Sequence, residues 1–218
     1  MSGGPDAVPP IRNAATIVIT RQTDTGPKLL MGQRSSGAVF MPDKFVFPGG
    51  AVDPGDYTAA EAEGVEEGDP RLLVETDPRL ARALRHAAIR ELREETGLWL
   101  GEPGGDADGE TGRPSTDALR FFFRAVTPPG RPRRFDARFF LADAGDLASA
   151  PDDFSGAEGE LGFLSWVDLD QARVLDLPFI TEIVLAEIAA RHADPEVERP
   201  VPYFNHTELG SHFHLLRA

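Results

Sequence analysis

Three glutamates lie close together in the stretch AIRELREETGL, which spans residues 88–98. Glu91, Glu94 and Glu95 are spaced i, i+3 and i+4, so on an α-helix they fall within a narrow arc of one face. Like charges at this spacing destabilise a helix by roughly 0.2–0.5 kcal/mol per pair, and partial burial costs more when no positive partner is present. The pattern therefore indicates a function that requires clustered carboxylates.

Two kinds of positive partner can make this cluster tolerable. Arg90 lies beside Glu91 in the sequence and can pair with a carboxylate through two parallel hydrogen bonds. A divalent cation can neutralise the remaining charge. Because oxygen ligands without His or Cys favour hard ions, the set points to Mg²⁺ or Mn²⁺ rather than zinc. The alternative is an ordinary surface helix rich in Glu and Arg.

The segment before this helix favours the metal interpretation. Residues 43–50, with the sequence DKFVFPGG, predict a strand that ends at Pro48, Gly49 and Gly50. Glycine leaves the backbone bare, so its amides and carbonyls can approach an ion or a phosphate closely. A strand, a glycine turn and an acidic helix together predict a site that binds phosphate and metal.

The same residues resemble the Nudix box, whose pattern is G-x5-E-x7-R-E-U-x-E-E-x-G-U, where U is an aliphatic residue. Gly50 matches the first glycine. The second half of the pattern is matched throughout, by Arg90, Glu91, Leu92, Glu94, Glu95, Gly97 and Leu98. Two departures occur: Asp56 stands in place of the first glutamate, and the spacer after it extends over residues 57–89. An insertion therefore splits the box.

This resemblance implies an α/β (α+β) fold, namely the Nudix α/β/α sandwich with a mixed sheet. It also implies hydrolysis of a nucleoside diphosphate linked to another moiety. By resemblance, Arg90 orients the carboxylates. The ligands of Mg²⁺ or Mn²⁺ would be the backbone carbonyl of Gly49 and the carboxylates of Glu91, Glu94 and Glu95.

The general base and the phosphate-binding residues are less specific predictions. Nudix enzymes use either a glutamate of the box or an acid from a later loop as the base, and Glu160 is the later acid here unless it is only a solvated strand end. Basic side chains are candidates for binding the substrate phosphates, the alternative being ion pairs with the acidic insertion. The candidates for substrate binding are Arg34, Gly50, Arg134 and Arg138, and Arg131 and Arg133 belong to the same basic cluster.

A second stretch of sequence indicates which branch of the Nudix family this chain resembles. The split box followed by VTPPGRPRRFDARFFLA, residues 126–142, is similar to the branch that includes the peroxisomal coenzyme A diphosphatases of animals and their bacterial relatives. This similarity implies coenzyme A or acyl-coenzyme A as substrate. ADP-ribose, other nucleotide sugars and dinucleotides stay open as alternatives, as does a non-catalytic nucleotide-sensing Nudix domain.

Elements that could position these residues can be read from the pattern of apolar and turn residues. Residues 1–13 predict a flexible arm and residues 14–218 a single domain, with an acidic surface insertion at about 57–77. The expected elements are a hairpin of 14–22 and 28–35, a helix from Asp77–Pro78 to Gly97, strands over 133–142 and 160–169, and a closing helix over 178–193.

The composition restricts the function further. The net charge is −14 and cysteine is absent, which excludes thiolate zinc sites and cysteine nucleophiles and disfavours nucleic acid. No apolar run approaches the ~18 residues that span a membrane. We therefore expect a cytoplasmic protein whose partner is a small-molecule nucleotide diphosphate, with neither nucleic acid nor membrane bound. Nudix proteins are often dimers, so a homodimer is also open.

Overall fold

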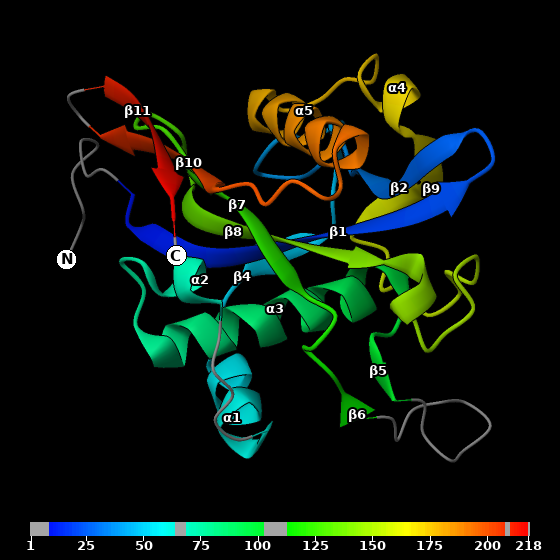
Figure 1. Cartoon of the computed structure of the whole chain (residues 1–218), viewed down its shortest axis with the longest axis horizontal. Coiled ribbons are helices and arrows are strands. Elements are labelled where there is room, and N and C mark those ends of the chain that lie inside the picture. The colour runs from blue at the N-terminus through cyan, green and yellow to red at the C-terminus, as the bar shows by residue number, and fades with distance from the viewer. Residues whose placement is uncertain (1–8, 64–68, 103–112, 208–209, 218) are drawn as a thin grey trace.

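The computed structural model describes residues 9–63, 69–102, 113–207 and 210–217 (Figure 1). Its centre is a mixed sheet with the strand order β11-β10-β7-β8-β1-β2-β3, in which β4 also pairs with β1 and β9 with β2. The strands are β1 (Ile11–Thr23), β2 (Gly26–Arg34), β3 (Phe45–Val46), β4 (Gly49–Ala51), β7 (Arg120–Val126), β8 (Arg134–Asp143), β9 (Leu161–Asp168), β10 (Val201–Thr207) and β11 (Gly210–Leu216). β1 runs parallel to β8 and β10 parallel to β7, whereas the other pairs are antiparallel.

Helices cover both faces of this sheet (Figure 1). On one face lie α1 (Pro54–Glu63), α2 (Pro70–Leu73) and α3 (Pro78–Thr96), and on the other lie α4 (Leu169–Ala172) and α5 (Phe179–Ala193). A short 3₁₀ helix (Ala144–Asp146) follows β8, and the small hairpin β5 (Gly101–Glu102) and β6 (Arg113–Pro114) lies apart from the main sheet. The predicted α/β/α sandwich with a mixed sheet is confirmed.

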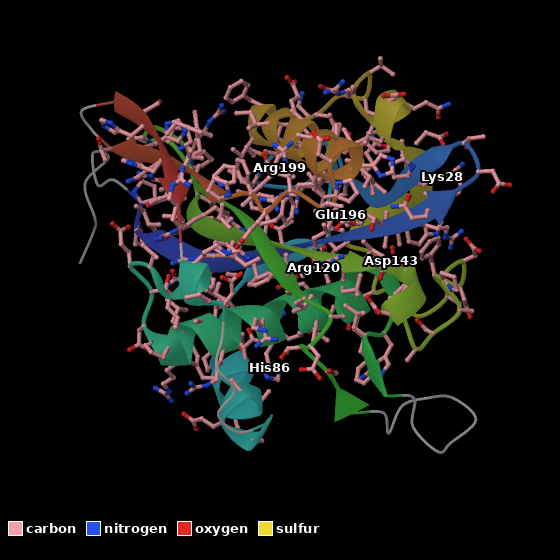
Figure 2. The ribbon with its side chains drawn as sticks, viewed as in Figure 1. Lys28, His86, Arg120, Asp143, Glu196 and Arg199 are labelled. Carbon is pink, nitrogen blue, oxygen red and sulfur yellow. The ribbon has the colours of Figure 1, made fainter. Side chains whose placement is uncertain are left out.

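The sheet is buried on both faces, and strand β1 shows why. Its consecutive residues Ile17, Val18 and Ile19 are all fully buried. Because neighbouring side chains of a strand point to opposite faces, Ile17 and Ile19 pack in the core on the α3 side and Val18 in the core on the α5 side. Side chains fill the space between the sheet and both helical layers (Figure 2).

Most of the predicted elements are present, with differences at their edges. Strand β1 begins at Ile11, so the last residues of the predicted N-terminal arm belong to the sheet, and residues 1–8 lie outside the described part. The acidic insertion forms α1 and α2, which we did not predict, although residues 64–68 lie outside the described part. In the described parts of the chain, no helix is long and apolar enough to cross a membrane.

Candidate active site

Helix α3 is fixed at both ends, which sets the direction of its glutamates. At the start, the Asp77 carboxylate accepts hydrogen bonds from the backbone N–H groups of Arg79 (2.8 Å) and Leu80 (3.2 Å). At the end, Gly97 adopts a left-handed φ of 74° and donates its N–H to the carbonyl of Arg93 (2.8 Å). The last turns of α3 are therefore a rigid support for the carboxylates.

Two glycines of β4 allow the sheet to approach this helix. A Cβ on Gly49 would lie 2.6 Å from the carbonyl oxygen of Ala15, and a Cβ on Gly50 only 2.1 Å from Oε1 of Glu91. The bare N–H of Gly49 donates to Oε2 of Glu95 at 2.8 Å. A side chain at Gly49 would thus collide with the backbone of β1, and one at Gly50 would collide with the carboxylate of Glu91, a predicted metal ligand.

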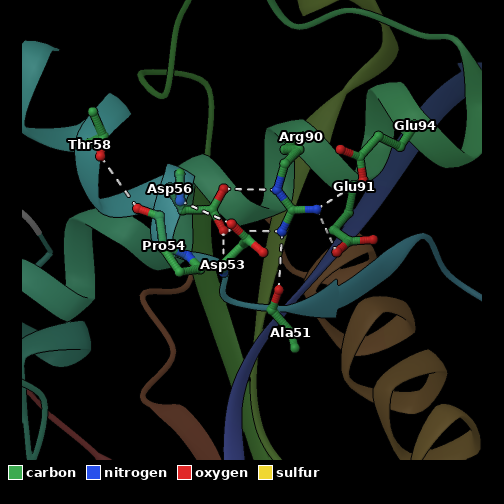
Figure 3. A network of polar contacts seen from close by, with 9 residues as sticks. Ala51, Asp53, Pro54, Asp56, Thr58, Arg90, Glu91 and Glu94 are labelled. Carbon is green, nitrogen blue, oxygen red and sulfur yellow. Dashed lines mark hydrogen bonds and ion pairs between the residues drawn. The ribbon is translucent and has the colours of Figure 1, made fainter.

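Arg90 ties the carboxylates of Glu91 and Glu94 to helix α1 (Figure 3). Its guanidinium donates to both oxygens of Asp56 (2.9 and 3.1 Å), to Glu91 (2.9 Å), to Glu94 (2.9 Å) and to the backbone carbonyl of Ala51 (3.1 Å). Asp56 is only 2% exposed, so Arg90 compensates an otherwise costly buried charge. The contacts with Glu91 and Glu94 fit the predicted orienting role.

A loop after β8 adds two further acids to the cluster. A Cβ on Gly97 would lie 2.9 Å from Cα of Gly156, and the N–H of Glu158 donates to the carbonyl of Glu94 at 2.8 Å. The chain then enters β9 through Glu160, whose charge acts on Glu91 and Glu95. The structure thus brings Glu160 to the carboxylate cluster. Sequence reasoning missed Glu158, although it lies two residues before Glu160.

Negative charge is in excess at this cluster. Burial raises the pKa of Glu95 to about 8, with further repulsion from Glu91 and Glu160 and opposing effects from the Gly49 N–H and Arg34. Burial also raises the pKa of Glu91, although Arg90 opposes that shift. The pKa of Arg90 is itself raised, because its bonds to Asp56 and the charge of Glu91 outweigh the cost of its burial. A further cation near Glu91 and Glu95 would be stabilised.

The donor chemistry of the cluster fits a divalent metal, but the conformation seen does not form a complete shell. Among the described residues, no three Asp, Glu or His side chains converge on a point that could hold an ion. The reason is visible in the bonds above, since Arg90 contacts Glu91 and Glu94 while Glu95 turns to Gly49. The Glu94 side chain is 39% exposed and so has room to rotate. All the available donors are oxygen atoms, as Mg²⁺ and Mn²⁺ prefer.

These carboxylates form one end of a cavity of about 470 Å³. The sheet face formed by β1, β8, β7 and β10 supplies its floor, and the first turn of α5 and the loop before β3 supply walls. Of the predicted site residues, those that line the cavity are Arg34, Gly49, Gly50, Glu91, Glu94, Glu95 and Glu160, together with Arg131 and Arg133 of the basic cluster. Arg90 lies behind this surface and supports it through the bonds in Figure 3.

Two predicted substrate-binding arginines are held away from the cavity. Arg138 is 1% exposed and bonds to Asn13 (2.8 Å), Asp136 (3.0 Å) and Thr76 (3.2 Å). Arg134 is also buried and donates from Nε to the carbonyl of Thr127 (3.1 Å). The structure therefore gives both of them internal partners instead of a place in the site.

Other cavity residues were missed by the sequence analysis. The aromatic and basic ones among them include Arg12, Phe40, Phe135, Phe179, Phe204 and His206. Phe179 is an apparent misfit on α5, since 65% of it is exposed. An exposed aromatic residue at the first turn of a helix gives no local signal of a site, and Arg12 falls within the predicted arm.

Two known proteins are similar to this chain. The crystal structure of a NUDIX hydrolase from Alicyclobacillus acidocaldarius matches with a TM-score of 0.63 and 28% identity, over 87% of this chain and 96% of that one. A curated relative, "Putative nudix hydrolase 7" of Caenorhabditis elegans, is 28% identical over 151 residues. Together they support membership of the Nudix hydrolase superfamily.

The extent of these similarities differs. The worm match covers 60% of this chain and 43% of the relative, so the chain spans less than half the length of that curated protein. No family model matches the chain.

Within the Nudix pattern the structure accounts for the unusual Asp56, because this shorter acid reaches Arg90 from the first turn of α1. The split box is thus reassembled in space around Arg90.

Proposed function

We propose that this protein is a metal-dependent Nudix hydrolase that cleaves the diphosphate linkage of a nucleoside diphosphate joined to another moiety. The observation that carries this proposal is the meeting of Glu91, Glu94 and Glu95 with the backbone of Gly49 at one end of a cavity of about 470 Å³. Such a volume is of the size that binds small molecules. The structural neighbour and the curated relative with Nudix hydrolase names support the same reaction class.

The groups of the chain would share the work as follows. Glu91, Glu94 and Glu95 would hold Mg²⁺ or Mn²⁺ with the Gly49 carbonyl, and such an ion supplies charge screening and a water of lowered pKa when bound. Arg90 holds two of these carboxylates and keeps them directed toward the cavity. Arg34 lines the cavity, and its buried Nε has no hydrogen-bond partner among the described residues, so it is free to bind a phosphate oxygen.

The general base is one of two groups. Glu160 lies at the carboxylate end of the cavity and can accept a proton from the attacking water. The alternative is a glutamate of the Nudix box itself. We take Glu160 as the first candidate because it lies outside the helix of the predicted ligands and its charge, unlike that of Glu158 from the same loop, acts on both Glu91 and Glu95.

Coenzyme A or acyl-coenzyme A is the substrate we propose to test first. The support for it is the resemblance of residues 126–142 to the coenzyme A diphosphatase branch. A location in the cytoplasm and assembly as a homodimer remain part of the same proposal. ADP-ribose and dinucleotides belong in the same test, because the proposed chemistry at the diphosphate is common to all of them.

The deciding experiment is product release from a small panel with Mg²⁺ or Mn²⁺ and an EDTA control. The panel contains coenzyme A, acetyl-coenzyme A, ADP-ribose, NADH and diadenosine polyphosphates. Glu95→Gln should abolish most turnover, whereas the control Glu61→Gln should not, since Glu61 pairs with Arg79 on the protein surface. Equal activity of Glu95→Gln and wild type would contradict the site, and a fully inactive wild type would favour a nucleotide-sensing domain.

A further inference from the structure

The cavity is strongly polarised along the strands that form its floor. The carboxylate end lies beside β4, whose Gly49 pairs with Thr16 and whose Ala51 pairs with Ala14 of β1. Arg12 lies further along the same face of β1, because residues 12, 14 and 16 alternate with residues that point to the other side. At ~3.3 Å per residue, Arg12 is about 13 Å along the strand from Thr16.

Two more arginines gather at this far end. Strand β8 runs parallel to β1 with Phe135 beside Arg12, and Arg133 lies two residues before Phe135. Arg131 precedes it in the same loop, and all three arginines line the cavity. Within the described residues, Arg12, Arg131 and Arg133 make neither ion pairs nor side-chain hydrogen bonds. By contrast, the buried Arg124 of β7 and Arg138 of β8 both pair with Asp136.

Aromatic side chains form another part of the cavity lining. The rings of Phe40 and Phe135 meet edge to face at 5.5 Å between centroids, and those of Phe179 and Phe204 at 6.3 Å. All four residues line the cavity. Exposed aromatic faces of this kind can stack on a nucleobase or cover an apolar chain. The cavity therefore offers an acidic, metal-type end and a basic end, and the rings of Phe40 and Phe135 lie beside the basic end.

We propose that Arg12, Arg131 and Arg133 bind a second phosphate of the substrate, one that is not cleaved. The substrate class is then a nucleoside diphosphate derivative that carries an additional phosphate on its nucleotide, as in coenzyme A or a phosphorylated dinucleotide. This inference rests on the proposed function, since it places the cleaved diphosphate at the carboxylate end. In a chain of net charge −14, three cations without protein partners are suited to attract such an anion.

Matched pairs of substrates that differ by this phosphate provide the test. Coenzyme A is compared with 3′-dephospho-coenzyme A, and NADPH with NADH, by the ratio of their kcat/KM values with Mg²⁺ or Mn²⁺ present. We expect the phosphorylated member of at least one pair to be favoured roughly tenfold, the effect of one hydrogen bond between charged groups. The triple variant R12Q/R131Q/R133Q should bring that ratio close to one, and added salt should reduce it in the wild type.

Arg120→Gln is the control variant, because it makes one Arg→Gln change of the same kind at the opposite end of β7 from the cavity residues Ala125 and Val126 (Figure 2). It should keep the wild-type ratio. Cleavage of both members at equal rates in the wild type would overturn this inference while supporting the proposed function. A preference that survives in the triple variant would overturn the assignment to these three arginines.

A binding measurement separates the two proposals completely. Titration with adenosine 3′,5′-bisphosphate and with adenosine 5′-monophosphate, without metal, requires no hydrolysis. Tighter binding of the bisphosphate, lost in R12Q/R131Q/R133Q, supports the second phosphate site even if no substrate of the panel is cleaved. Equal binding of the two nucleotides together with equal cleavage of each substrate pair would contradict it.

Discussion

Without divalent metal, the wild-type protein should lose stability as the pH rises, because the buried Glu95 must ionise. Glu95→Gln should abolish this loss. Glu95 is 2% exposed, and burial raises its pKa from an ordinary 4.5 to about 8. Below about pH 4.5 the carboxyl is protonated in both the folded and the unfolded state and costs nothing. Between about pH 4.5 and 8 the unfolded state ionises first, so the free energy of unfolding falls. Above about pH 8 both states are ionised and the fall ends.

The size of this effect follows from the two pKa values. At 1.36 kcal/mol for each pKa unit, the difference between 4.5 and about 8 is on the order of 5 kcal/mol. Glutamine has no such titration and keeps an oxygen that can accept the N–H of Gly49, which bonds to Glu95 at 2.8 Å. The variant should therefore be more stable than the wild type above neutral pH, and the difference should vanish toward about pH 4.5.

Urea denaturation in EDTA at several pH values measures this directly. The quantity to compare is the difference in free energy of unfolding between Glu95→Gln and wild type, because carboxylates common to both proteins then cancel. The same difference for Glu61→Gln, an exposed glutamate of α1, should not show this rise with pH. If the free energy of unfolding changed with pH in the same way for Glu95→Gln and wild type, the idea of a buried, ionisable carboxylate at the end of α3 would be refuted.

The remaining predictions concern the metal, the glycines and the polar network. Millimolar Mg²⁺ or Mn²⁺ should raise the melting temperature of the wild type and have a smaller effect on Glu95→Gln, and equal shifts would argue against the metal site. Gly50→Ala should lower kcat strongly with little loss of stability, because the added methyl group meets a carboxylate, whereas Gly49→Ala should lower the melting temperature, because it meets the backbone of β1. Arg90→Gln should cost about 3 kcal/mol in urea denaturation, because the buried carboxylate it pairs with is left unpaired. If Glu160 is the base, Glu160→Gln should lower kcat roughly 100-fold with little change in KM.

What could be predicted from the sequence is mostly local. The start and end of α3 follow from Asp77 and Gly97, whose capping roles depend on neighbouring residues alone. The positions of the glutamates within α3 then follow from helical geometry. The fold class was accessible for a related reason, since alternating strands and helices leave few ways to bury their apolar faces.

The arginines show where this reasoning fails. Four of them lie between residues 131 and 138, and composition alone could not divide them into two groups. The register of β8 does so, because Arg133 shares a face with Phe135 and lines the cavity, whereas Arg134 and Arg138 alternate to the opposite face and are buried. Which face of a strand borders a cavity depends on distant elements, here α5 and the loop before β3, so it cannot be read from the strand itself.

The insertion that splits the Nudix box also becomes understandable from the structure. Arg90 still contacts Asp56 and the backbone carbonyl of Ala51, the residue after Gly50, because the described residues between 57 and 89 form the rest of α1, α2 and the first turns of α3. The carboxylates lie at the other end of α3, so the insertion does not displace them. Asp56 is fixed from two sides, by Arg90 and by the N–H of Asp53 at 2.7 Å, and its burial leaves little space for a longer side chain. The shorter acid and the insertion are therefore structurally linked, because the same helix α1 carries Asp56 to Arg90 and begins the insertion.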